Sequence, residues 1–303
     1  MKIRFVDFEM DESVVAPVIY DEVPHQATNR GVVLPPEVRV EIGCFLSRFN
    51  NFLTVERPPY YRIDAYFDEN SLWILELNAS FVDGWGVALN LARAAGIAID
   101  PKALVFPNQF AVRDAVYRPE LELFVRELAV LGLTGRSILG PDRNDGELTY
   151  VYGRVGSKDQ LCTLPYDGLR LDDKLNLGLF ARQWDGELVR VPRHYVSRFE
   201  DWEEVPQETV LKFCDKGSAE CERAGQSVIF GKPNGKARFL KRCYREERLI
   251  AQDFVKPARQ GSSSCQLVIL AIGDEPVAGY VQYSWGWRRI INDDSTHGPL
   301  RIS

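Results

Sequence analysis

Two short segments of the chain place charged and amide side chains two residues apart, Arg62-x-Asp64 and Glu76-x-Asn78. Both segments lie in stretches where apolar and polar residues alternate, which predicts two strands joined by a polar turn. Side chains alternate between the two faces of a strand, so each polar pair shares one face. Matching the apolar faces of the two strands sets Asp64 opposite Glu76. The same register sets Arg62 opposite Asn78.

Two carboxylates that face each other across a strand pair repel unless a positive charge lies between them. Arg62 is one source of that charge. A hard divalent cation is the better fit, because two carboxylates and an amide oxygen are typical magnesium ligands. Asp64, Glu76 and Asn78 are therefore candidate ligands of a magnesium ion that holds nucleotide phosphates during phosphoryl transfer. The alternative is a solvated polar face on a surface hairpin.

Three basic residues further along the chain are candidates for phosphate contacts. Lys212 lies within the apolar run 209–213, where an unpaired lysine is costly to bury, so it either binds phosphate or lies at an exposed edge. Lys174 lies at the start of a predicted helix and is either a phosphate ligand or a solvated lysine. Arg288 follows an aromatic run and either faces a phosphoryl group or pairs at the surface.

The elements that must position these residues are a mixture of helices and strands. Apolar spacing and terminal Pro, Gly and Asp residues predict helices over 37–53, 86–95, 119–131 and 172–184. Alternating apolar runs predict strands over 60–67, 72–78, 148–152, 210–214, 227–230 and 249–255, and a hairpin formed by 266–272 and 277–284. The pairing of the first two strands also sets Ala65 opposite Leu75. The first 35 residues have irregular patterning and 292–298 are turn-like, so the chain is α plus β with a sheet-rich C-terminal part.

The polar segments, taken in order, resemble those of ATP-grasp enzymes. Arg62-x-Asp64 followed by Glu76-x-Asn78 resembles the family's metal-binding motif, and the strand around Lys212 resembles the one whose lysine reaches nucleotide phosphates. The order, with the metal motif first, is similar to that of the circularly permuted type found in the synthetase domain of glutathionylspermidine synthetase and its relatives. After Asn78 the chain reads Ala-Ser-Phe-Val-Asp-Gly-Trp-Gly, where those relatives carry an Asp-Thr-Pro turn.

The resemblance implies a role for each candidate residue. Magnesium is bound by Asp64, Glu76 and Asn78, and the phosphates of ATP by Lys174 and Lys212. Arg62 and Arg288 stabilise the phosphoryl group and the developing negative charge. The strand 249–255 resembles the hinge against which adenine packs, with Gln252 acting through its backbone. The hinge contacts are expected from Gln252, Asp253, Phe254 and Val255.

The implied fold is a circularly permuted ATP-grasp fold of the α/β (α+β) class, with nucleotide bound between two sheet-containing subdomains. Residues 1–86 carry the metal motif, and 87–170 form an α/β subdomain like those that precede ATP-grasp domains. Residues 171–258 form the nucleotide lid and hinge, and 259–303 supply return strands that pack with 1–86.

The implied activity is that of an ATP-dependent ligase that uses Mg²⁺ and ATP to join a carboxylate to an amine or thiol through an acyl phosphate. The substrates are small molecules or peptides. A formal charge of −6 argues against general nucleic-acid binding, and the chain lacks apolar runs of membrane-spanning length, so a cytoplasmic location is expected. Two alternatives stay open: an inactive nucleotide-binding regulatory or scaffolding protein, and a strand-rich interaction protein.

Overall fold

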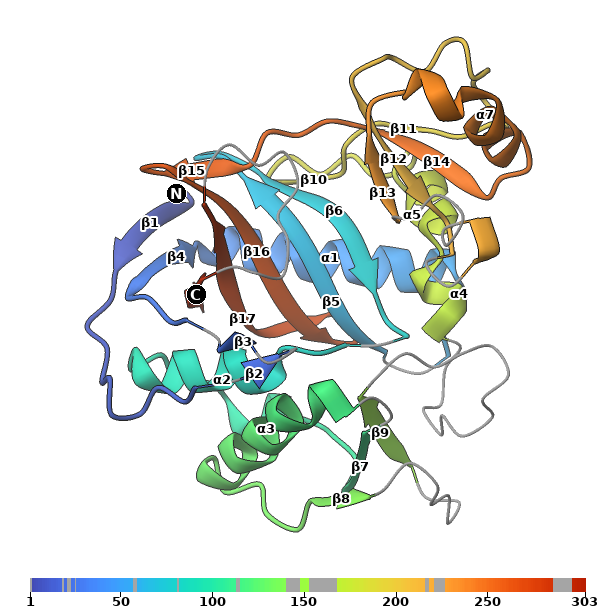
Figure 1. The fold of residues 1–303 in the computed structure, drawn as a ribbon. Helices are drawn as coiled ribbons and strands as arrows, with labels where there is room; N and C mark the ends of the chain where they lie inside the picture. Colours follow the sequence, from blue (N-terminus) through green and yellow to red (C-terminus); the bar gives the residue numbers. More distant parts are fainter. Residues whose placement is uncertain are drawn as a thin grey trace.

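The chain folds as a mixed α/β protein whose strands form one large sheet and three smaller ones (Figure 1). The computed structural model describes residues 2–17, 19–20, 23–24, 26–56, 59–80, 82–112, 115–139, 148–152, 168–215, 218–220, 227–285 and 296–303. Arg288 lies outside the described residues. Within these ranges, every helix is too short or too polar to cross a bilayer.

The large sheet combines strands from both ends of the chain. Its strand order is β1-β4-β18-β17-β16-β5-β6-β10, and β15 pairs with β16. The strands are β1 (Arg4–Asp7), β4 (Arg30–Leu34), β5 (Tyr60–Phe67), β6 (Leu72–Asn78), β10 (Val189–Arg190), β15 (Ala258–Gln260), β16 (Ser263–Ile272), β17 (Glu275–Ser284) and β18 (Thr296–Ile302). Strands β16, β17 and β18 therefore share one sheet with β5 and β6, although some 200 residues separate them in sequence.

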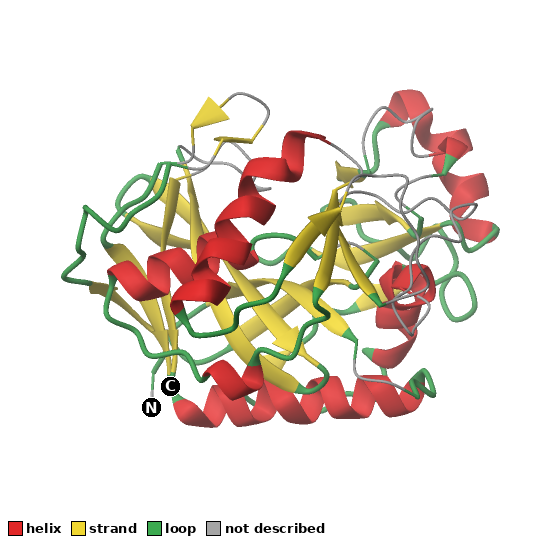
Figure 2. Ribbon diagram, turned by 90° about the horizontal axis from the view of Figure 1, so that it is seen from below, coloured by secondary structure: helices red, strands yellow, loops and turns green. Residues whose placement is uncertain are grey.

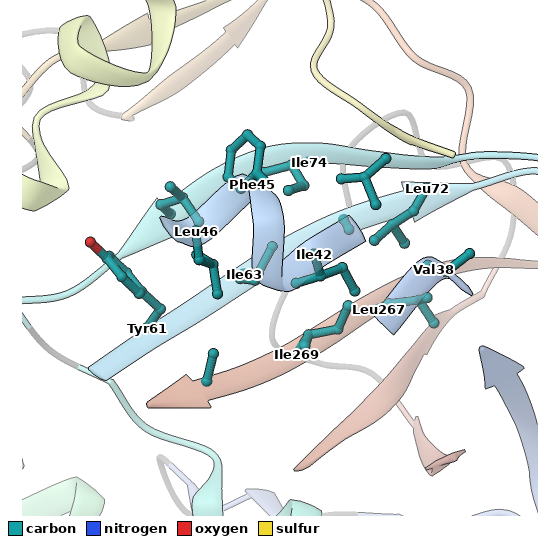
Figure 3. Close-up of a cluster of buried hydrophobic side chains, with 14 of the residues drawn as sticks. Val38, Ile42, Phe45, Leu46, Tyr61, Ile63, Leu72, Ile74, Leu267 and Ile269 are labelled. Carbon is teal, nitrogen blue, oxygen red and sulfur yellow. The ribbon is translucent and has the colours of Figure 1, made fainter. Parts of the chain in front are cut away.

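Helix α1 (Pro36–Phe52) covers one face of the large sheet (Figure 2). Its buried residues recur at helical spacing, so they form a single apolar stripe; they are Val38, Ile42, Phe45, Leu46 and Phe49. Figure 3 shows this stripe packed on side chains of β5, β6 and β16. Pro36 suits the first turn, where its missing N–H leaves no hydrogen bond unmade.

The opposite face of the large sheet packs against a smaller α/β layer. Helix α2 contacts β17 and β18, and α3 packs on α2 beside the three-stranded sheet β8-β7-β9. This layer contains α2 (Trp85–Ala94), η1 (Pro101–Ala103), β7 (Gln109–Val112), η2 (Ala115–Tyr117), α3 (Arg118–Val130), β8 (Ser137–Leu139) and β9 (Thr149–Tyr152). A short pair, β2 (Ile19–Tyr20) and β3 (Val23–Pro24), lies against α3.

A four-stranded sheet, ordered β11-β14-β12-β13, lies beyond the β6 side of the large sheet (Figure 1). Helix α7 covers one face of this sheet, and α5 packs on the other near Cys214 and Ile250. The elements are α4 (Gly168–Asp172), α5 (Lys174–Phe180), β11 (His194–Tyr195), β12 (Thr209–Phe213), β13 (Val228–Phe230), η3 (Asn234–Lys236), α7 (Ala237–Arg245) and β14 (Leu249–Asp253).

Three expectations from the sequence need correction. The helix expected over 172–184 is divided into α4 and α5, because Asp173 has an extended backbone and caps α5 by accepting a hydrogen bond from the Leu175 N–H (2.9 Å). The irregular first 35 residues contain the strands β1 and β4. Residues 296–298 of the expected turn belong to β18, which lies between β17 and β4, and β4 is remote in sequence.

Candidate functional site

The β5–β6 pair carries the first half of the candidate site. As expected, Asp64 pairs with Glu76 and Arg62 with Asn78. Ala65 pairs with Ile74 and not with Leu75, so the expectation for that pair is wrong. Leu75 is the extra residue of a β-bulge, which reverses the alternation of side chains beyond it.

The bulge has two consequences for the site. Leu77 on one side of the bulge, and Ile74 and Leu72 on the other, all face the apolar core under α1. Glu76 stays on the polar face opposite that core. The bulge also leaves the Leu75 carbonyl available to a donor outside the strand pair, and that donor is Lys212.

Arg62 lies between two carboxylates. Its Nε donates to Asp64 Oδ1 (2.9 Å) and its Nη1 donates to Asp83 Oδ1 (2.7 Å), with all three side chains largely buried. Burial disfavours the charged guanidinium, yet Asp64 and Asp83 together raise the pKa of Arg62 well above its usual value. Arg62 is thus held as a cation on the polar face of the sheet. Asn78 Nδ2 lies 3.5 Å from the second oxygen of Asp64.

The sequence analysis did not identify Asp83 as a member of the site. The sequence feature that could have pointed to Asp83 is the glycine that follows it. Gly84 has a φ of +90°, and a Cβ there would lie 2.8 Å from the Tyr280 hydroxyl. Gly84 therefore lets the chain turn into α2 against the large sheet, which places Asp83 beside Arg62.

Lys174 joins the helix beside the small sheet to the polar face of the β5–β6 pair. Its Nζ lies 3.0 Å from Glu76 Oε1, and the two side chains are only 4% and 10% exposed. Lys174 is the first residue of α5, whose start is set by the Asp173 cap. Asp172, the last residue of α4, accepts hydrogen bonds from the backbone of Ala79 and the hydroxyl of Ser80, which ties α4 to the end of β6.

Lys212 links the two sheets directly. Its Nζ donates to the Leu75 carbonyl (2.7 Å), and the residue is 6% exposed. β12 lies between β14 and β13, so Lys212 does not occupy a sheet edge and the exposed-edge alternative is wrong. Burying a lysine side chain is costly for folding, so a buried lysine is a candidate for a functional role.

The expected hinge residues lie at the end of β14. Gln252 is buried and pairs with Val210 of β12. Asp253 accepts a hydrogen bond from the Tyr195 hydroxyl (3.0 Å). Phe254 packs edge-on against Phe230 of β13, with ring centroids 5.1 Å apart. Phe254 and Val255 follow β14 and lead toward β15 of the large sheet.

The structure therefore brings together most of the residues predicted from the sequence. Contacts connect Arg62, Asp64 and Asn78 into one group and Glu76 and Lys174 into a second. Lys212 contacts the carbonyl of Leu75, the residue before Glu76 on β6. The expected hinge residues lie on the same small sheet as Lys212.

The oxygen atoms of Asp64, Glu76 and Asn78 fit a magnesium ion by chemistry, since hard cations take carboxylate and amide oxygens. Two ligands of one ion must lie close together. Asp64 and Glu76 meet this requirement in the backbone, because they are directly opposite each other on paired strands. Among the described residues, three or more His, Cys, Asp or Glu side chains do not gather in a metal-binding arrangement, so the candidate set depends on the amide of Asn78 as its third member.

Comparisons with known proteins find similarity to solved structures alone. No protein-family model matches the sequence, and no curated protein matches it. One of these structures is a candidate gamma-glutamylcysteine synthetase from Methylobacillus flagellatus KT, 12% identical, aligned over 85% of this chain and 84% of that chain with a TM-score of 0.41. A likeness at this level leaves function to be argued from the site itself.

Proposed function

We propose that this protein is an ATP-dependent ligase with a circularly permuted ATP-grasp fold, which joins a carboxylate to an amine or thiol using Mg²⁺ and ATP. The observation that carries the proposal is the meeting of two buried lysines, Lys174 and Lys212, with the polar strand pair that holds Asp64 and Glu76. The lysines come from the small sheet and its helix, and the carboxylates from the large sheet, so a nucleotide between the sheets contacts both.

The charge balance of this region favours a magnesium nucleotide. Each acidic candidate ligand is near a basic side chain: Asp64 near Arg62, and Glu76 near Lys174. Glu76 would hold a magnesium ion in place of that basic charge, and Lys174 would then have the phosphates as its anionic partner. The exchange therefore needs no carboxylate or ammonium group to be left buried without a counter-charge.

In the proposed reaction Lys174 Nζ and Lys212 Nζ donate to phosphate oxygens of ATP. Arg62, which Asp64 and Asp83 hold as a cation, stabilises negative charge that develops on the transferring phosphoryl group. Magnesium, when bound, neutralises phosphate charge and orients the transfer. The substrate carboxylate attacks the γ-phosphorus to give an acyl phosphate and ADP. An amine or thiol then displaces phosphate from the acyl carbon.

Further roles in the proposal come from the hinge and from the C-terminal segment. Asp253, Phe254 and Val255 line the adenine through the backbone and the Phe254 ring. Arg288 is the proposed second cation at the phosphoryl group.

The proposal is tested first by ligand-dependent stability. Mg²⁺ with ATP is expected to raise the melting temperature of the wild-type protein, because a ligand bound only by the native state stabilises it by about 2.7 kcal/mol at 100 times its Kd. Asp64→Asn and Lys212→Met are expected to lose this rise. Asp185→Asn, at an exposed position paired with Arg48, is the matched control and should keep it.

Turnover distinguishes a ligase from a nucleotide-binding regulator. ADP formation is measured with panels of carboxylates, amines and thiols. A rise in melting temperature that is equal in wild type and Asp64→Asn would overturn the metal site. Nucleotide binding without acid-dependent ADP formation would instead support the regulatory protein.

A further inference from the structure

Helix α7 carries three arginines on the side that faces solvent, and we call them the arginine stripe. They are Arg238, Arg242 and Arg245, all of them exposed. With about 3.6 residues per turn, the three side chains fall within an arc of about 60°. The residues on the opposite side of α7 are buried against the small sheet; they are Leu240, Cys243 and Tyr244.

The arginine stripe forms no ion pair within the described part of the chain. The neighbouring Lys241, by contrast, is paired with Glu203. Arg242 packs against the ring of Phe239 one turn earlier, with its Cζ 5.8 Å from the ring centroid. Three guanidinium groups therefore face solvent with N–H donors that a partner can use.

The stability of α7 does not account for the arginine at its start. The first turn of a helix carries a partial positive charge, so an acidic residue stabilises it and a cation destabilises it. The first turn of α7 contains Arg238 and no acidic residue. Arg242 and Arg245 lie in the last turn, where a cation is favourable. A residue that opposes the local preference of its element is a candidate for a role other than folding.

The arginine stripe fits a short row of carboxylates. A planar guanidinium donates two parallel hydrogen bonds to a carboxylate, and the stripe extends about 10 Å along the helix at a rise of about 1.5 Å per residue. Three cations are fewer than the roughly four to eight basic residues typical of contact with an anionic membrane. The formal charge of −6 opposes the approach of nucleic acid, whose charge continues beyond the stripe. An acidic protein segment matches the stripe in both length and charge.

We infer that the arginine stripe docks an acidic segment of a partner protein, with Asp or Glu side chains paired to Arg238, Arg242 and Arg245. The inference is independent of the proposed function. Helix α7 covers one face of the small sheet, and α5, which carries Lys174, packs on the other. Figure 1 shows α7 at the outer margin of the molecule, beyond the small sheet. A partner bound there leaves the candidate site open.

The test is fluorescence anisotropy of labelled probes mixed with the whole chain at about 0.15 M salt. The main probe is a peptide with glutamate at every third or fourth position, and the same peptide with glutamine in place of glutamate is its control. Wild type is expected to bind the acidic peptide alone. The triple variant Arg238→Gln/Arg242→Gln/Arg245→Gln is expected to bind it at least about tenfold more weakly, since each exposed ion pair is worth about twofold to fivefold in affinity.

The matched control is Arg4→Gln/Arg118→Gln/Arg301→Gln. It makes the same change in net charge at exposed positions of other elements and should keep the wild-type affinity. The stripe variant should keep the wild-type melting temperature, because its three side chains face solvent. Weaker peptide binding by the stripe variant is then a loss of contacts and not of folding.

Equal affinity of the wild type and the stripe variant, or no binding of the acidic peptide by the wild type, would overturn the inference. Tighter binding of a single-stranded oligonucleotide, or of vesicles of phosphatidylserine and phosphatidylcholine, than of the peptide would also overturn it. A wild-type protein that binds the peptide but shows no stabilisation by Mg²⁺ with ATP would overturn the proposed function and leave this inference standing.

Discussion

At the scale of single residues, the ion pair between Lys174 and Glu76 is unusual because both side chains are out of water. Removing charge from water costs several kcal/mol per ion, and mutual attraction offsets that cost only while both partners are present. Such a pair contributes little net stability, but breaking it leaves a buried charge. It is therefore suited to a place where a ligand exchanges one partner for another.

We predict that Lys174→Met lowers the free energy of unfolding by about 3 kcal/mol, because the carboxylate of Glu76 loses its buried counter-charge. Urea unfolding at pH 7 measures the change. The double variant Lys174→Met/Glu76→Gln should recover most of the loss. Lys2→Met, which breaks the exposed pair with Glu69, is the control and should have almost no effect. An equal loss in the single and double variants would contradict the prediction.

His194 makes stability depend on pH. Burial, reinforced by the charge of Lys212, lowers its folded-state pKa to about 3, below the unfolded value of 6.5, so at acid pH the unfolded chain binds a proton that the folded protein does not. The contribution is complete above pH 6.5 and is lost progressively as the pH falls toward 3. Between pH 7 and pH 5 the unfolding free energy is expected to fall by about 2 kcal/mol from this group alone.

The measurement is urea unfolding of wild type and His194→Phe at pH 7, 6 and 5. Carboxylates titrate alike in both proteins, so the difference between the two curves isolates the histidine. That difference should shrink by about 2 kcal/mol between pH 7 and pH 5. Parallel curves would show that His194 takes up its proton equally in the folded and unfolded states, which would contradict the lowered pKa.

At the scale of elements, the segment from β6 into α2 aligns the polar residues. The bulge at Leu75 turns the Leu75 carbonyl toward Lys212, and the left-handed Gly84 begins α2 next to Asp83. Both features are deviations of the backbone from regular structure beside the candidate site, and strained backbone is commonly found at such sites.

We predict that Gly84→Ala destabilises the protein much more than Gly132→Ala. Both glycines have a positive φ, +90° and +80°, so both substitutions cost about 1 kcal/mol in backbone strain. At Gly132 the new methyl group meets open space, but at Gly84 it meets the Tyr280 ring and hydroxyl. This overlap should add about 1–3 kcal/mol, measured as the difference in unfolding free energy. Equal losses would show that Tyr280 moves aside freely.

The strand pair could be predicted from the sequence because its two faces differ so sharply. Alternation places Asp64 opposite Glu76, and the structure agrees. The bulge was not predictable from the sequence. Its position depends on whether Ile74 or Leu75 packs into the core beneath α1, and the two residues are equally apolar.

The remainder of the site escaped sequence reasoning for a similar reason. Asp83 joins the candidate site through its ion pair with Arg62, which is distant in the chain, and a lone Asp carries no periodic signal. Strands β1 and β4 were missed because they are short. β1 pairs with β4, and β4 pairs in turn with β18, which is at the other end of the sequence.

At the scale of the whole molecule, buried polar contacts join the small sheet and its helix α5 to the large sheet. Lys174 and Lys212 bind the small sheet and its helix to β6. A nucleotide between the sheets would add contacts to both sides at once.

We predict that Mg²⁺ with ATP slows amide hydrogen exchange in β5–β6 and in β12–β14 together, because one ligand stabilises both sheets against local opening. Exchange in α3 and β7, which belong to neither the large sheet nor the small one, should stay unchanged and serves as the internal control. Mass spectrometry of peptic fragments measures both. Protection confined to one sheet would indicate that the ligand lies outside the junction.

The place of β18 has a consequence for how the chain is made. β18 lies between β4 and β17 and is hydrogen-bonded to both, although it follows every other described strand of this sheet in the sequence. Until it leaves the ribosome, β4 and β17 each present an open edge to other nascent chains. The large sheet can therefore be completed only after translation of all its other strands. Removal of residues 296–303 should cause aggregation during expression more than a modest loss of stability.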